Sequence, residues 1–285
     1  MRDAEILVGY DGSTDAGVAL TWALDEAERS GQPVRLTYVF EWLTVAGWIG
    51  PGVAPGVWPD DTARRQVDDL VRRAAADAAA AHPRLTVTSE VYDGPPALVL
   101  QERSAEAGLL VLGSRGHGGF GGLLAGSTAV AVAAHAHCPV VVVRDGPGTT
   151  TAEAPAGPVA VGVDGSAAAL VALGFAAERA AQRQVPLRAL HAWTPGPGGA
   201  AGVPDERAAV EAALEPWRRT FPDLAMTVDL VSGSPAAMLI EASRDAGLVV
   251  VGSRGRGGLA GMLLGSVSQQ LIQHAHCPVA VVRER

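Results

Sequence analysis

The chain contains the same series of motifs twice, and this internal duplication restricts the folds open to it. The segment ILVGYDGS at 6–13 returns as VAVGVDGS at 159–166, an offset of 153 residues. Further along, HAHCPVVVV at 135–143 returns as HAHCPVAVV at 274–282, an offset of 139 residues. The first half therefore carries about 14 extra residues, which we place within 44–61.

The 285 residues are enough for two domains of ordinary size, each with its own core. Between the two halves, the segment DGPGTTTAEAPAG is rich in Pro, Gly, Thr and Ala, which is typical of a linker. We expect a first domain at 1–146, a linker at 147–157 and a second domain at 158–285.

A glycine frame occurs once in each half: Gly, two residues, Gly, nine residues, Gly-Ser. Each copy follows an apolar run, LLVLG or LVVVG, and precedes a helical stretch. Glycines let backbone N–H groups approach a ligand closely, and such a turn before a helix forms an anion site. The frame therefore predicts two phosphate-binding sites, at the following positions: Gly113, Gly116, Gly126 and Ser127, and Gly252, Gly255, Gly265 and Ser266.

Strand and helix patterns alternate along both halves, which predicts open, mostly parallel, doubly wound sheets. Apolar runs without polar alternation are typical of strands that helices cover on both faces. The first half has predicted strands at about 5–10, 33–40, 85–91, 108–113 and 139–144, and helices at 14–30, 61–81, 95–107 and 122–136. The second half repeats the order, with strands near 158–163, 186–193, 225–231, 248–252 and 278–283.

These motifs together resemble the universal stress proteins, twice and over nearly the whole chain. The resemblance rests on the Val-Gly-x-Asp-Gly-Ser opening, the glycine frame and the terminal Cys-Pro-Val strand. It implies two tandem Rossmann-like (adenine nucleotide alpha hydrolase-like) domains, each a five-stranded parallel sheet of order 3-2-1-4-5. It also implies pseudo-twofold pairing of the two domains, and bound ATP where the glycine frame is complete.

The resemblance carries over to site residues position by position. In the first half these are Gly9, Asp11, Val39, Gly113, Ser114, Arg115, Gly116, His117, Gly118, Gly119, Gly126, Ser127 and Thr128. In the second half they are Gly162, Asp164, Ala192, Gly252, Ser253, Arg254, Gly255, Arg256, Gly257, Gly258, Gly265, Ser266 and Val267. Because Ala192 replaces Val39 and Arg256 replaces His117, the two sites need not bind equally well.

Some of these residues have a simpler alternative role. Asp11 and Asp164 follow the first strand of each half, where a turn aspartate would bond the next backbone amides. The alternative is contact with ribose or with a phosphate-bound Mg²⁺, which we favour because the position lies at the switch point of the sheet. Ser127 and Ser266 could serve as helix N-caps, a role compatible with phosphate binding. No metal site built from protein side chains alone is expected, since the His pairs at 135/137 and 274/276 diverge on a helix.

Charge and composition narrow the classes of partner. The net charge of −8 argues against a nucleic-acid surface, and no apolar run reaches the roughly 20 residues of a membrane span. With only two cysteines, the chain is expected in the reducing cytoplasm. The tryptophans Trp42, Trp48 and Trp58 would form either a partner surface or a cover over the first site.

The predicted function is an ATP-binding regulator in a stress response, with two ATP sites, Mg²⁺ at the phosphates and a signalling partner not identified by the sequence. Two alternatives remain open: a slow ATPase or nucleotidyl-transfer enzyme on the same fold, and a structural dimerisation module whose sites are empty or hold another adenine nucleotide. A homodimer of whole chains is compatible with the sequence, which does not decide whether two chains associate. The exchange of His117 for Arg256 argues against a shared catalytic base, because arginine stays protonated at neutral pH. We therefore expect nucleotide binding with at most weak ATP hydrolysis.

Overall fold

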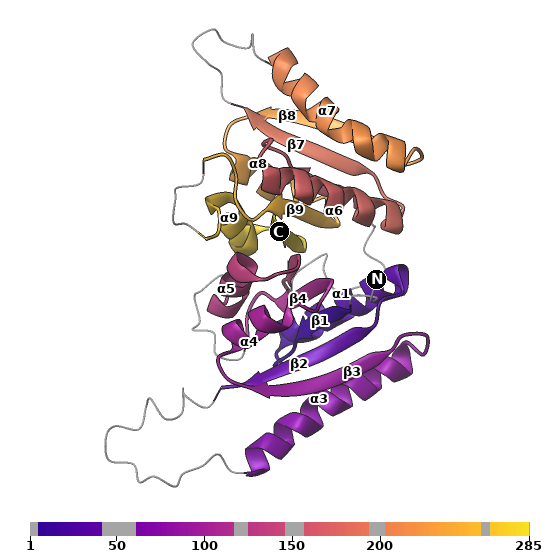
Figure 1. Cartoon of the computed structure of the whole chain (residues 1–285), viewed down its shortest axis with the longest axis vertical. Coiled ribbons are helices and arrows are strands. Elements are labelled where there is room, and N and C mark those ends of the chain that lie inside the picture. The colour runs from indigo at the N-terminus through magenta and orange to yellow at the C-terminus, as the bar shows by residue number, and fades with distance from the viewer. Residues whose placement is uncertain are drawn as a thin grey trace, which may run out of the picture.

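The computed structural model describes residues 5–41, 61–116, 125–145, 157–193, 203–257 and 263–284. They form one continuous ten-stranded sheet with helices on both faces (Figure 1). The predicted fold class, a doubly wound α/β structure present twice, is confirmed. The predicted linker lies outside the described residues except for Gly157, as do the tryptophans at 42, 48 and 58.

Both halves have the same succession of elements. The first half consists of β1 (Ile6–Gly9), α1 (Thr14–Ser30), β2 (Val34–Phe40), α3 (Asp61–Ala81), β3 (Val87–Asp93), α4 (Pro96–Arg103), β4 (Leu109–Gly113), α5 (Ser127–His135) and β5 (Val140–Val143). The second half consists of β6 (Val159–Gly162), α6 (Ala167–Arg183), β7 (Leu187–Trp193), α7 (Val203–Thr220), β8 (Met226–Ser232), α8 (Pro235–Ala242), β9 (Leu248–Gly252), α9 (Ser266–His274) and β10 (Val279–Val282).

The strand order along the sheet is β3-β2-β1-β4-β5-β10-β9-β6-β7-β8. Counted within its own half, each set of five strands has the order 3-2-1-4-5, and its neighbours are parallel. The two halves join where β5 pairs with β10 in antiparallel fashion, with Val141 opposite Ala280. The two predicted sheets are thus halves of a single sheet, because the edge strand of each supplies backbone partners for the other.

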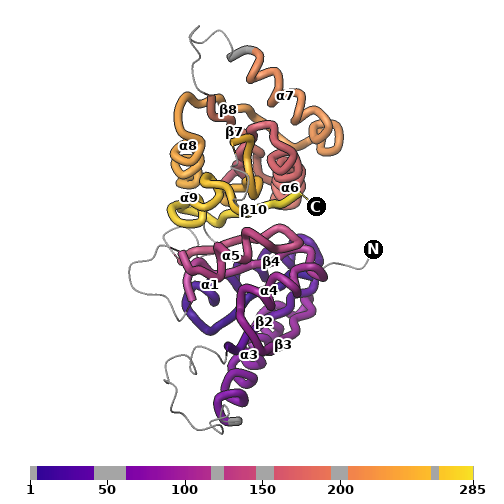
Figure 2. The backbone as a smooth tube through the Cα atoms, turned by 60° about the vertical axis from the view of Figure 1, so that its left-hand side comes forward, coloured from indigo at the N-terminus to yellow at the C-terminus, as the bar shows by residue number. Residues whose placement is uncertain are grey.

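Two apolar cores lie on the two faces of this sheet, and each core runs through both halves. On one face α1, α3, α6 and α7 pack residues such as Trp22, Val71 and Leu214. On the other face α4, α5, α8 and α9 pack residues such as Leu100 and Leu271. Figure 1 shows the two sets of helices on opposite sides of the strands, and Figure 2 shows the halves stacked along the long axis.

Local sequence explains where the helices begin and end. The hydroxyl of Ser13 accepts a hydrogen bond from the Ala16 N–H at 3.2 Å, which caps α1. Gly31 ends the same helix in the left-handed region, with φ of 72°. The helix predicted at 95–107 ends at Arg103, because the N–H groups of Ala105 and Glu106 bond to carbonyls three residues back and tighten the chain into turns.

Candidate functional site

The site of each half is built where two neighbouring parallel strands end. β1 lies beside β4, and β6 lies beside β9. Asp11 follows β1 and Asp164 follows β6, while the glycine frames begin at the ends of β4 and β9. The topology therefore brings each predicted aspartate next to its glycine frame, at the switch point of the strand order where ligands of such sheets bind.

Asp164 holds the turn after β6 against the loop after β9. Its Oδ1 accepts hydrogen bonds from the N–H and the hydroxyl of Ser166, at 2.9 and 2.6 Å. Its Oδ2 accepts one from the Arg256 N–H at 2.9 Å. Burial raises the pKa of this carboxyl, but the bonds from Ser166 and Arg256 outweigh burial and hold the pKa below its ordinary value. Asp164 is therefore ionised at neutral pH.

This contact explains the second glycine of the frame. A Cβ placed on Gly255 would lie 2.4 Å from Oδ2 of Asp164, and one on Gly116 would lie 2.5 Å from Oδ2 of Asp11. Asp11 also accepts a hydrogen bond from the Ser13 N–H at 2.9 Å. Both aspartates thus make the turn bonds of the simpler alternative, and both lie against the glycine loop. A role toward ribose or Mg²⁺ stays a prediction.

The frame closes on itself before the following helix. The Gly126 N–H donates to the Ser114 carbonyl, and the Gly265 N–H donates to the Ser253 carbonyl, each at 2.7 Å. The N-caps of α5 and α9 are Gly126 and Gly265, and neither cap has a side-chain hydrogen bond. The N-cap alternative for Ser127 and Ser266 was wrong: both are the first residues of their helices. Glycine caps leave the N–H groups of the first turn for another acceptor.

In the second half these residues enclose a cavity of about 290 Å³. Most of the residues predicted for this site line it: Gly162, Asp164, Ala192, Gly252, Arg254, Gly255, Arg256, Gly257, Gly265, Ser266 and Val267. Ser253 is buried beneath the loop. Gly258 lies outside the described residues.

One wall of the cavity is apolar and was not predicted. It includes Leu190 of β7 and Met238 and Leu239 of α8. The repeat of DGPPALVL as SGSPAAML marks α8 as part of the duplicated unit, so the comparison of the two copies contained this signal. An apolar wall opposite a few polar groups is the usual composition of a small-molecule site.

The opposite end of the cavity is cationic. Arg254 and Arg256 line it, and the first turn of α9 adds the positive end of a helix dipole. Arg283, which follows β10, has its pKa lowered by burial and by the charge of Arg254. Its Nη1 is buried and finds no hydrogen-bond partner among the described residues. The two guanidinium groups in the lining, with the charge of Arg283 close to that of Arg254, make this part of the cavity suitable for an anion.

The first half repeats the arrangement as far as it is described. Gly9 ends β1, Val39 of β2 packs against the second core, and Ser114 is fully buried. Thr128 lies in the first turn of α5. His117, Gly118 and Gly119 lie outside the described residues.

A difference between the halves lies at Asp15, which sequence reasoning did not single out. Oδ2 of Asp15 accepts hydrogen bonds from the Ser114 hydroxyl at 2.6 Å and from the Arg115 N–H at 3.0 Å. Its Oδ1 lies 3.3 Å from Nη2 of Arg115. In the second half Ala168 occupies the equivalent position and has no carboxylate. In the first frame, therefore, the Ser114 hydroxyl and the Arg115 N–H already donate to a protein carboxylate. The second frame has no carboxylate at the equivalent position.

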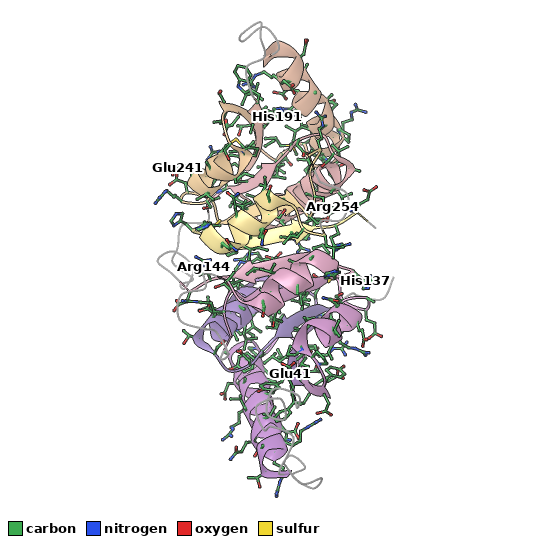
Figure 3. All side chains as sticks on the ribbon, turned by 90° about the vertical axis from the view of Figure 1, so that its left-hand side faces the viewer. Glu41, His137, Arg144, His191, Glu241 and Arg254 are labelled. Atoms are coloured by element: carbon green, nitrogen blue, oxygen red, sulfur yellow. The ribbon has the colours of Figure 1, made fainter. Side chains whose placement is uncertain are left out.

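Arg144 connects the two halves beside the first site. It follows β5, and its Nη2 donates to the carbonyls of Ile272, at 3.0 Å, and Gln273, both in the last turn of α9. Figure 3 shows Arg144 where the two halves meet. The first turn of the same helix lines the cavity of the second half, so α9 contacts the second site at one end and the first half at the other.

Two further findings concern the predicted exclusions. Nδ1 of His135 lies 2.9 Å from the Ala131 carbonyl within its own helix. Across the described parts of the chain, no three or more potential metal-ligating side chains come together. Within the same parts, none of the helices combines the length and apolar character that crossing a membrane requires.

The fold and the site define a class: a tandem doubly wound α/β protein with a glycine-lined site at the carboxyl ends of the strands in each half. The model of the Universal stress protein family matches residues 4–144 and again 156–283. The chain belongs to the universal stress protein family, as a tandem member.

Full-length relatives support this assignment. A universal stress protein of Mycobacterium tuberculosis is 38% identical over 288 residues, covering 98% of this chain and 96% of the relative. One of Mycolicibacterium smegmatis is 36% identical over 287 residues, covering 98% and 97%. The crystal structure of a universal stress protein from Archaeoglobus fulgidus covers 99% of both chains with a TM-score of 0.74 at 19% identity, which shows a shared fold.

Proposed function

We propose that this stress protein binds adenine nucleotides, ATP in particular, at one site in each half. The observation that carries the proposal is the two-ended cavity of the second half. Its apolar wall, with Leu190, Met238 and Leu239, suits a base, and its cationic end, with Arg254 and Arg256, suits phosphates. The N–H groups at the start of α9 supply further donors for an anion.

The residues present also fit Mg²⁺ bound through the phosphates. Asp164 is an ionised carboxylate at the edge of the cavity, and magnesium is usually held by one or two carboxylates together with substrate phosphates. Asp11 has the equivalent place in the first half. In this proposal the metal neutralises phosphate charge, while the chain orients the nucleotide through its glycine frame.

We further propose that the protein holds the nucleotide rather than hydrolysing it. A hydrolase needs a group that takes a proton from the attacking water or orients that water. Both oxygens of Asp164 already accept hydrogen bonds from the protein, and a guanidinium group, as on Arg256, is a poor proton acceptor. Bound nucleotide would then act by changing which signalling protein or second chain the molecule contacts, in the cytoplasm.

Calorimetric titration of the full chain with ATP and Mg²⁺ tests binding. Gly255→Ala should weaken binding at the second site and Gly116→Ala at the first, because each new Cβ displaces an aspartate. Gly17→Ala is the matched control, since a Cβ there meets no atom within 4 Å and therefore touches no residue of the frame. Folded protein that gives no heat at any ATP concentration overturns the proposal.

A phosphate-release assay on the same samples tests the holding role. Turnover above about 1 s⁻¹, the low end of typical enzymes, would place the protein among the ATPases. Turnover well below that rate, together with tight binding, supports a nucleotide holder.

A further inference from the structure

Glu26 and Arg179 are equivalent residues of the two halves, and they contact each other. α1 and α6 correspond with the same offset of 153 residues that relates the opening motifs, so residue 26 corresponds to residue 179. Nη1 of Arg179 donates to Oε1 of Glu26 at 2.6 Å. Two equivalent residues can meet only at the axis that relates the halves. Val141 and Ala280, also equivalents, mark the same axis in the sheet.

The contact is charged, and little of it is exposed to solvent. Glu26 has no exposed surface, and the side chains of Arg179 and Arg183 are 9% and 12% exposed. Nη2 of Arg183 donates to Oε2 of Glu26 at 2.7 Å, so both carboxylate oxygens are held by the other half. Aromatic rings complete the shell, with Arg183 5.1 Å from the ring centroid of Trp22 and Arg179 4.9 Å from that of Phe175.

The pairing of β5 with β10 does not distinguish one half from the other. β5 reads VVVV and β10 reads VAVV, and both are fully buried with backbone bonds as their polar contacts. Each of these strands has the composition to pair with a copy of itself as readily as with the other. Backbone pairing and small apolar side chains stabilise the contact between the two strands, but they do not select which half pairs with which.

The charges of Glu26 and Arg179, by contrast, differ between the two halves and can select which half pairs with which. If two first halves paired in this way, Glu26 of one would face Glu26 of the other, and two second halves would place Arg179 against Arg179. Buried like charges are strongly unfavourable because desolvation is not offset. Arg29 of the first half lies 3.9 Å from Oε2 of Glu26, but it is 41% exposed, so solvent screens the counter-charge that it offers. We infer that the Glu26–Arg179 contact is a specificity element that permits pairing of a first half with a second half and excludes pairing of like halves from two copies of the chain.

Full-chain variants test this inference through stability. Glu26→Arg creates two facing arginines and Arg179→Glu two facing glutamates, and each should lower the thermal midpoint by roughly 5–10 °C. The double exchange Glu26→Arg with Arg179→Glu restores opposite charges and should recover at least half of that loss. Glu178→Arg, an exposed charge reversal on the same helix, is the matched control and should leave the midpoint unchanged.

Mixing the two single variants tests partner choice itself. One variant has arginine and the other glutamate in both halves, so complementary halves exist only between the two chains. Native mass spectrometry should detect complexes containing both variants in the mixture, and none between wild-type and doubly exchanged chains. The inference is overturned if the double exchange is no more stable than the weaker single variant, or if the mixture contains no mixed complexes.

Discussion

The contacts of the Asp15 carboxylate lead us to predict that the two sites differ in their affinity for ATP. A phosphate that uses Arg115 in the first half must compete with Asp15, which already accepts from the Arg115 N–H and lies 3.3 Å from its guanidinium. In the second half the equivalent residue is Ala168, which has no carboxylate to compete with a phosphate for Arg254. We therefore expect the first site to bind ATP more weakly than the second, and Asp15→Ala to tighten it.

The size of the effect follows from these contacts. A hydrogen bond to a charged group contributes about 1.5–3 kcal/mol. The Arg115 side chain is 53% exposed, so solvent screening reduces its share and the lower end of that range applies. About 1.4 kcal/mol corresponds to a tenfold change in dissociation constant. Asp15→Ala should thus tighten ATP binding at the first site about tenfold, and Ala168→Asp should weaken the second site by a similar factor.

Calorimetry can isolate the first site when Asp15→Ala is made in a Gly255→Ala background, in which the second site is impaired. Asp15→Asn is the matched control: it keeps an acceptor of the same shape beside Ser114 and removes only the charge. If charge competition is the cause, Asn should reproduce most of the gain. Unchanged or weaker binding by Asp15→Ala in folded protein would refute the reasoning.

Two further predictions concern buried groups. Burial raises the pKa of the Cys277 thiol to about 12, so a thiol reagent at pH 8 should leave it unmodified in native protein and modify it in denaturant; rapid native labelling, located by peptide mass, would contradict this burial. Burial raises the pKa of Glu26, but Arg183 and Arg179 outweigh it and lower the pKa below 4.5. Glu26→Gln should therefore have a lower free energy of unfolding than wild type at pH 7. Because the carboxylate's contribution disappears as pH falls through its pKa in the folded protein, chemical denaturation should show this difference shrinking below about pH 4. A difference that does not depend on pH would show that charge is not the cause.

The fold was predictable because its signals are local and repeated. Buried runs such as LLVLG, the capping Ser13 and the glycine frames each act within a few residues, and the duplication lets every pattern be read twice. The lining of the second cavity followed from the same frames, since parallel strands of this order place their carboxyl ends together.

What sequence reasoning missed depends on side chains that meet across long distances. Asp15 looks like an ordinary acidic residue in the first turn of a helix, and only the packing of α1 on the end of β4 brings it to Ser114. Glu26 and Arg179 look like surface charges on amphipathic helices until the helices cross at the axis. The glycine N-caps were missed because Ser127 and Ser266 have the residue type that normally caps a helix.

The contact between Arg144 and the last turn of α9 has a mechanical consequence. α9 is a helix of nine residues. Its first turn lines the second cavity, and its last turn accepts hydrogen bonds from Arg144, which follows β5 of the first half. If a bound ligand shifts the first turn of α9 toward its phosphates, the last turn of the helix shifts as well. Arg144 then either moves with that turn or loses its hydrogen bonds to it. Arg144 in turn lies close enough to Arg115 and Asp15 for their charges to affect its pKa. If both proposed sites bind nucleotide, α9 and Arg144 give them a physical connection that lies outside the sheet.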